Sequence, residues 1–181
     1  MKTSKLWYWI LAARPKTLSA SLIPVIVGCT LSYMYYSFKL APAMICLIFA
    51  FFAQIISNYL KDYFDFINGA DRADRLVHER AVAKGWFKPG EMLRMAVMMS
   101  ILAIMIGFGL IYYVEWKLIF VGIAVCLGAY AYSSVPYPLA YHGLGDICVV
   151  IFYSVIPVGF TYYVQAIDWN TIVTYWVTIV R

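Results

Sequence analysis

Four aspartates lie within 13 residues, in a chain in which only 13% of the residues are charged. They are Asp62, Asp65, Asp71 and Asp74, and Asn58 precedes them. On a helix of about 3.6 residues per turn, Asn58, Asp62 and Asp65 share one face. A row of oxygen ligands suits Mg²⁺ and, through the metal, a phosphate group. The alternative is a solvated acidic loop at a helix end.

Basic side chains are interleaved with these acids, namely Arg72, Arg75, Arg80 and Lys84. Arginine and lysine bind phosphate oxygens directly. Simple binding to a membrane surface would require the basic residues but not the acids. The combination therefore favours a magnesium–diphosphate site over the solvated loop.

A second polar segment covers residues 130–146. Its tyrosines, Tyr132 among them, are typical of an interfacial aromatic belt. Asp146 begins an apolar run, where an ionised side chain is costly unless it has a function or a partner. Gly143 and Gly145 allow the backbone to approach a ligand or another helix closely. We interpret Asp146 as a second candidate functional residue.

Other chemistries fit the sequence poorly. It contains no glycine-rich phosphate loop, no His-Glu-x-x-His motif and no serine paired with a histidine and an acid. The four cysteines stand in apolar runs without Cys-x-x-Cys spacing, which indicates packing rather than disulfides or zinc binding. We expect no binding to nucleic acid, because the chain offers no folded polar surface for it.

The acids must be positioned by membrane-spanning helices, since 64% of the 181 residues are hydrophobic. Each of five apolar runs approaches the length of about 20 residues that a bilayer requires. We predict an all-α, polytopic transmembrane helical bundle that forms one domain over residues 1–181, with a short interfacial helix near Lys5. A sixth run starts near Thr171. The five complete runs are 17–36, 40–60, 92–114, 116–135 and 144–164.

The distribution of positive charge predicts the orientation. Of the 14 lysines and arginines, only Lys39 and Lys117 fall on one side of the predicted bundle. The positive-inside rule then places the N-terminus, the acidic loop and the segment 134–146 in the cytoplasm.

Three separated motifs resemble a known family. The acidic motif, with Asn58, Asp62 and Asp65 followed by Gly69-Ala70-Asp71-Arg72-Ala73-Asp74-Arg75 and Arg80-Ala81-Val82, resembles the first aspartate-rich motif of UbiA-type intramembrane prenyltransferases. The opening Arg14-Pro15-Lys16-Thr17-Leu18 and the later Tyr141-His142-Gly143-Leu144-Gly145-Asp146 are similar to the branch that prenylates 1,4-dihydroxy-2-naphthoate in menaquinone synthesis.

This resemblance implies a helical bundle of about nine spans in the bacterial inner (cytoplasmic) membrane, with active-site loops in the cytoplasm. It implies transfer of a polyprenyl group from polyprenyl diphosphate to 1,4-dihydroxy-2-naphthoate. Carbon dioxide and diphosphate are lost, and demethylmenaquinol is formed. Membrane lipid surrounds the isoprenoid tail, and Mg²⁺ is the implied cofactor.

The resemblance also implies roles for residues. Asn58, Asp62 and Asp65 form the first metal face, with Asp62 and Asp65 as catalytic residues, and Asp71 and Asp74 extend it. The diphosphate is held by Arg75, Arg80 and Lys84. Asp146 and Tyr132 are expected near the aromatic acceptor.

The sequence departs from the family pattern at three points. Lys61 replaces a usual asparagine, and on a helix it could pair with Asp65 or reach the diphosphate. Val77-His78 replaces a usual Gly-Pro. A second aspartate-rich loop is missing from the sequence, so we expect the N-terminal part of a prenyltransferase, truncated at its C-terminus and weak or inactive alone.

Other functions remain open from the sequence. The acceptor could be another aromatic compound such as 4-hydroxybenzoate. A cation-binding transporter piece is a different class, although transporters place charged residues near the middle of the bilayer. An inactive fragment is the third possibility.

Overall fold

The computed structural model describes residues 4–35, 37–69, 80–111, 120 and 150–166. All regular structure within these ranges is helical. The helices are α1 (Lys5–Ala12), α2 (Leu18–Met34), α3 (Leu40–Ile67), α4 (Pro89–Ile111) and α7 (Ile156–Gln165). A 3-10 turn, η1 (Pro15–Thr17), joins α1 to α2, and a π-helical turn, η3 (Ile151–Val155), precedes α7.

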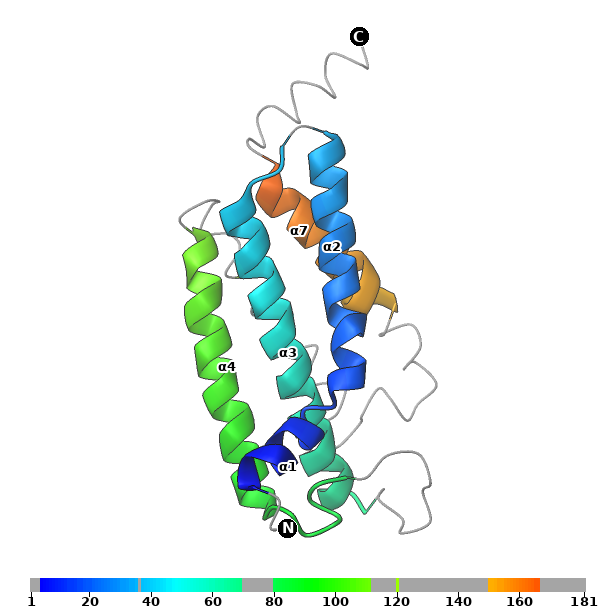
Figure 1. Ribbon diagram of the computed structural model, residues 1–181, viewed down its shortest axis with the longest axis vertical. Helices are drawn as coiled ribbons and strands as arrows, with labels where there is room; N and C mark the ends of the chain where they lie inside the picture. Colours follow the sequence, from blue (N-terminus) through cyan, green and yellow to red (C-terminus); the bar gives the residue numbers. More distant parts are fainter. Residues whose placement is uncertain (1–3, 36, 70–79, 112–119, 121–149, 167–181) are drawn as a thin grey trace.

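Three long helices run side by side, with α3 between α2 and α4 (Figure 1). Helix α7 packs against α2, and α1 crosses near the end of the bundle at which α3 ends. The chain bends between α1 and α2 at Arg14, whose φ of 52° lies in the left-handed region. Both the amide and the hydroxyl of Thr17 donate to the Arg14 carbonyl, each at 2.9 Å, and so fix this bend. We call residues 13–17 the elbow.

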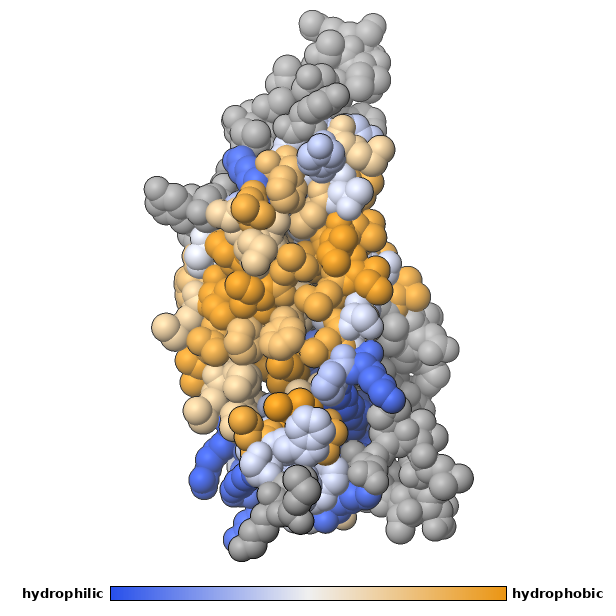
Figure 2. Space-filling view, in the orientation of Figure 1, coloured by the Kyte–Doolittle hydropathy of each residue, from blue (hydrophilic) through white to orange (hydrophobic). Residues whose placement is uncertain are grey.

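The surface has the pattern expected of membrane helices. The face seen in Figure 2 carries a broad hydrophobic band over α2, α3 and α4, and hydrophilic residues gather at the end that carries α1. Large apolar side chains on α4, such as Met98, Met105 and Phe108, are exposed. Three segments are long and apolar enough to cross a membrane, namely Lys5–Met34, Leu40–Ile67 and Pro89–Leu110.

The predicted spans 17–36, 40–60 and 92–114 correspond to α2, α3 and α4. Helix α3 continues beyond the apolar run to Ile67, so the acidic motif begins on a helix. The fifth predicted span overlaps η3 and α7. The fourth span, apart from Phe120, and the sixth lie outside the described residues. The total of five spans plus a sixth, the surface position of α1 and the single domain remain predictions.

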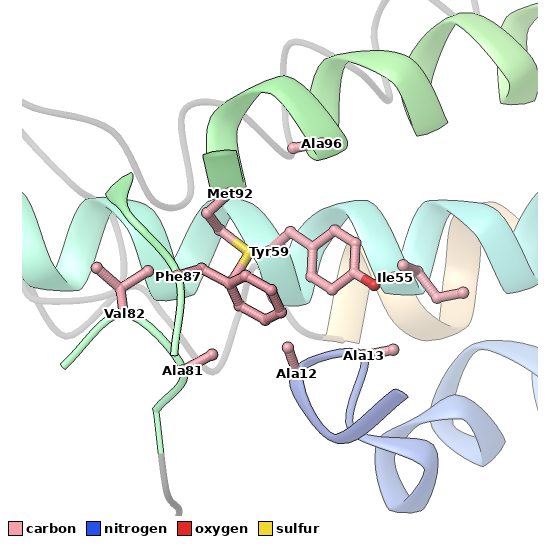
Figure 3. Close-up of a cluster of buried hydrophobic side chains, with 9 residues drawn as sticks. All are labelled: Ala12, Ala13, Ile55, Tyr59, Ala81, Val82, Phe87, Met92 and Ala96. Carbon is pink, nitrogen blue, oxygen red and sulfur yellow. The ribbon is translucent and has the colours of Figure 1, made fainter. Parts of the chain in front are cut away.

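A cluster of buried apolar side chains closes the end of the bundle near α1 (Figure 3). Tyr59, Phe87 and Met92 come together there from α3, the turn before α4, and α4 itself. The small side chains of Ala12 and Ala13 bring the end of α1 against them. This cluster therefore joins α1, the turn before α4 and α4 to α3, beside the polar residues of α3.

Candidate functional site

Helix α3 buries a polar face in its second half. Gln54, Asn58, Asp62 and Asp65 are all buried, and the two aspartates are only 2% and 3% exposed. Their spacing places them along one side of the helix, as the sequence pattern predicts. Burial of two carboxylates is costly unless charges or hydrogen-bond donors compensate, so their partners matter.

Asp62 is held unequally at its two oxygens. Its Oδ2 accepts hydrogen bonds from the backbone amides of Ala81, at 2.9 Å, and Val82, at 3.4 Å. Its Oδ1 lies 3.5 Å from Nη2 of Arg14, in an ion pair. That oxygen accepts no hydrogen bond within the described part of the chain. One oxygen is thus anchored by the backbone, whereas the other has only a facing charge.

Asp65 has a different partner. Its Oδ2 accepts a hydrogen bond from Nη1 of Arg80, which also forms an ion pair with it. Both side chains are largely buried. Two guanidinium groups therefore lie against the two carboxylates, and each aspartate of the face has a basic partner from a different segment.

Asn58 connects the same face to the elbow. Its Nδ2 donates to the Ala13 carbonyl at 2.8 Å and to the Thr17 hydroxyl at 2.9 Å. Nε2 of Gln54 donates to the same hydroxyl at 3.4 Å and to Oδ1 of Asn58 at 3.5 Å. The amide side chains of α3 thus fix the elbow, and through it the backbone of Arg14.

The turn that supplies the amides to Asp62 is braced by aromatic rings. Trp9 of α1 stacks on Phe87 with ring centroids 3.9 Å apart, and Tyr8 lies 4.8 Å from Trp86. The Tyr59 hydroxyl donates to the Trp9 carbonyl at 3.2 Å. Figure 3 shows Phe87 beside Tyr59, with Ala81 and Val82 next to them. Helix α1 therefore supports the donors that hold Asp62.

The structure brings together Asn58, Asp62, Asp65 and Arg80 among the predicted site residues. Lys61 is half-buried on α3, and the exposed Lys84 places its ammonium 5.8 Å from the centre of the Trp86 ring. The remaining predicted residues lie outside the described part of the chain. These are Asp71, Asp74, Arg75, Tyr132 and Asp146.

Sequence reasoning missed three residues of this arrangement, namely Arg14, Thr17 and Gln54. Arg14 and Thr17 belong to a motif that we noted only for its resemblance and its charge. Gln54 offered a usable signal, because it is a polar residue in an apolar run, one helical turn before Asn58.

The donor set is compatible with Mg²⁺. It consists of carboxylate and amide oxygens, which hard cations prefer, and Oδ1 of Asp62 is a buried acceptor without a hydrogen bond in the described ranges. Among the described residues, three His, Cys, Asp or Glu side chains do not meet at one point. A metal here would require Asn58, or ligands from outside these ranges.

Comparison with known proteins agrees with this chemistry. Residues 21–180 match the model of the UbiA prenyltransferase family. Two proteins named 1,4-dihydroxy-2-naphthoate octaprenyltransferase are 33% identical to the chain. The Escherichia coli protein aligns over 87% of this chain and 53% of its own length. The Haemophilus influenzae protein aligns over 91% of this chain and 56% of its own length.

A more distant relative is a UbiA prenyltransferase domain-containing protein 1 homolog of Drosophila melanogaster. It is 30% identical over 92% of this chain and 48% of its own length. The chain spans about half the length of the curated relatives it matches. The family match and the three apolar helices together indicate an integral membrane protein.

Proposed function

This chain belongs to the UbiA prenyltransferase family, and on that premise we propose that it serves menaquinone biosynthesis. The reaction is transfer of a polyprenyl group from polyprenyl diphosphate to 1,4-dihydroxy-2-naphthoate, with loss of carbon dioxide and diphosphate. The names of the Escherichia coli and Haemophilus influenzae relatives support this acceptor. Since the chain spans about half of their length, the proposal concerns the contribution of this half to the reaction.

One observation carries the proposal: two buried carboxylates on one face of α3 each lie against an arginine. Asp62 faces Arg14, and Asp65 is paired with Arg80. Such a site contains both groups that a metal-bound diphosphate needs, oxygen ligands for the cation and guanidinium groups for the anion.

Magnesium would be held by Asp62, Asp65 and Asn58, with Asp71 and Asp74 completing the set. When bound, it supplies positive charge that favours departure of the diphosphate. Arg75, Arg80 and Lys84 bind diphosphate oxygens, and Lys61 assists them. The apolar surfaces of the helices accommodate the isoprenoid tail and exclude water from the reacting carbon.

The acceptor lies near Asp146 and Tyr132 in this proposal. The N-terminus and the acidic loop face the cytoplasm of a bacterium, because the basic residues concentrate on that side. The membrane is the inner one, where the polyprenyl substrate is dissolved.

Binding of a prenyl diphosphate tests the proposed magnesium–diphosphate site. The purified chain, in detergent, is titrated with radiolabelled farnesyl diphosphate with and without Mg²⁺. We expect Mg²⁺-dependent binding that weakens at least about tenfold in Asp62→Asn, because a neutral carboxamide has no negative charge and only one oxygen to offer the cation. Glu91→Gln is the control, since Glu91 is an acid at the start of α4, where it pairs with the exposed Lys5.

Equal binding with and without Mg²⁺, or unchanged binding by Asp62→Asn, would contradict the proposal. The acceptor is tested separately by adding 1,4-dihydroxy-2-naphthoate or 4-hydroxybenzoate and measuring the prenylated product. Product from 4-hydroxybenzoate alone would replace the proposed acceptor but leave the prenyl-transfer chemistry in place.

A further inference from the structure

The two buried aspartates are held in different ways. Asp65 and Arg80 share a hydrogen bond as well as an ion pair. Arg14 and Asp62 share only an ion pair, at 3.5 Å. Oδ1 of Asp62, the oxygen that faces Arg14, accepts no hydrogen bond in the described ranges. Replacing Arg14 at this oxygen by another cation therefore breaks no hydrogen bond to Asp62.

The other oxygen of Asp62 does not depend on Arg14. It is held by the amides of Ala81 and Val82, in a turn that the stacked rings of Trp9 and Phe87 brace. The carboxylate can therefore keep its position while the partner of Oδ1 changes.

The backbone of Arg14 is equally independent of the ion pair. The left-handed elbow is fixed by Thr17, and Asn58 ties the preceding carbonyl to α3. Only the side chain of Arg14 has to move for the ion pair to open. That side chain is 15% exposed, so it is not completely enclosed.

Electrostatic repulsion would prevent Arg14 and a divalent cation from occupying Oδ1 of Asp62 together. A buried carboxylate requires a positive partner, and Arg14 supplies it. A divalent cation at Oδ1 would lie within a few ångströms of the guanidinium, and two like charges that close repel each other strongly. The cation and Arg14 therefore compete for the same oxygen.

From these contacts we infer that Arg14 is the resting counter-ion of Asp62, which it leaves when a divalent cation binds. Arg14 is then a positioning residue: it keeps the carboxylate charged and in place for the cation. The inference rests on the proposed function only in assigning a divalent cation to this face.

Affinity for a cation alone tests the competition. Mn²⁺, which is visible by electron paramagnetic resonance, is titrated into the purified chain without diphosphate. Removal of the competing charge in Arg14→Gln is expected to tighten Mn²⁺ binding by about tenfold. Two control variants should bind Mn²⁺ with an affinity within about twofold of that of the unaltered chain. Arg14→Lys keeps the charge at this position, and Lys16→Gln removes an exposed charge from the same elbow.

A purely structural role for Arg14 predicts the opposite sign, because loss of its support would loosen the ligands and weaken Mn²⁺ binding. Weaker or unchanged binding by Arg14→Gln therefore overturns the inference. Should this variant fail to fold, the unaltered chain decides. Phenylglyoxal labels accessible arginines, and labelling of Arg14 is followed by mass spectrometry with and without Mn²⁺.

We expect Mn²⁺ to increase the labelling of Arg14 several-fold, and sodium chloride of equal ionic strength to leave it unchanged. Labelling that Mn²⁺ does not increase overturns the inference. If Mn²⁺ binds and Asp62→Asn abolishes the binding, but Arg14 does not respond, only this inference fails. If the unaltered chain does not bind Mn²⁺ at all, the metal of the proposed function fails with it.

Discussion

The two ends of the bundle are held together by different forces. At the end near α1, Asp62 and Asp65 are buried against Arg14 and Arg80. At the opposite end, α2 packs on α7, and Gly28 lies close to Thr161 and Val158. A Cβ atom on Gly28 would lie only 2.8 Å from both Cβ of Thr161 and the carbonyl oxygen of Val158.

Hydrogen bonds at that opposite end are neutral as well. The Ser32 hydroxyl donates to the Gly28 carbonyl at 2.9 Å, and the Lys39 amide donates to Oε1 of Gln165 at 2.6 Å. A carboxylate that is paired with an arginine can instead pair with another cation. The close contact between α2 and α7 at Gly28 has no such alternative partner. The comparison therefore agrees with our inference that the partner of Asp62 can be exchanged at the ionic end, whereas the contacts of the neutral end offer no such exchange.

Loss of Asp62 should have the largest effect on stability. Asp62→Ala leaves Arg14 without this carboxylate and removes the acceptor of two backbone amides. We expect a loss of about 3 kcal/mol in the free energy of unfolding, because Arg14 is partly exposed and can recover some hydration. Equilibrium unfolding in mixed micelles measures this change in the free energy of unfolding. A loss below that of the Gly28 variant would contradict the importance of charge at this end.

Gly28→Ala tests the neutral end. The added methyl group meets a backbone oxygen that cannot move alone, so we expect a loss of about 2 kcal/mol in the same unfolding assay. The matched control is Gly159→Ala on α7, where no atom lies within 4 Å of the added Cβ. The control should be neutral or slightly stabilising, because alanine favours helices. Similar behaviour of the two variants would refute close helix packing at Gly28.

Phe87→Leu tests the aromatic bracing of the charged end. The substitution keeps an apolar side chain but removes the stacked contact with Trp9, so we expect a loss of about 1 kcal/mol. Hydrogen exchange of the Ala81 and Val82 amides should also become faster, as these amides hold Asp62 from the braced turn. Phe108→Leu, at an exposed position of α4, is the control. If hydrogen exchange of these two amides does not change, the stacked rings do not stabilise the turn that holds Asp62.

Lys5→Gln should have the smallest effect. Lys5 and Glu91 form an ion pair at 3.2 Å that is exposed at the same end of the bundle. Solvent screens such a pair, so we expect no measurable change in unfolding. A clear loss would show that surface charges stabilise this end too, which would weaken the distinction between its buried and exposed ion pairs.

The helical part of the site was predictable because its signal is local. Asn58, Asp62 and Asp65 have helical spacing, and an apolar run leads into them, so their shared face follows from the sequence alone. The apolar runs likewise predicted α2, α3 and α4. What the pattern did not contain is the partner of each group.

These partners come from distant parts of the chain. Arg14 lies opposite Asp62 at a point where its own backbone adopts a left-handed conformation. This conformation is uncommon for residues other than glycine, so the sequence does not predict it. The donors to Oδ2 of Asp62 are backbone amides, and every residue except proline carries one. Asn58, expected as a metal ligand, also uses its amide nitrogen to tie down the elbow.

The bend at Arg14 also bears on membrane thickness. It leaves α2 with 17 residues, a rise of about 25 Å, whereas the hydrocarbon layer of a bilayer measures about 30 Å. A span this short is matched by local thinning of the lipid or by flanking side chains that extend to the interface. Bilayer thickness therefore bears on the segment next to α2 that carries Arg14.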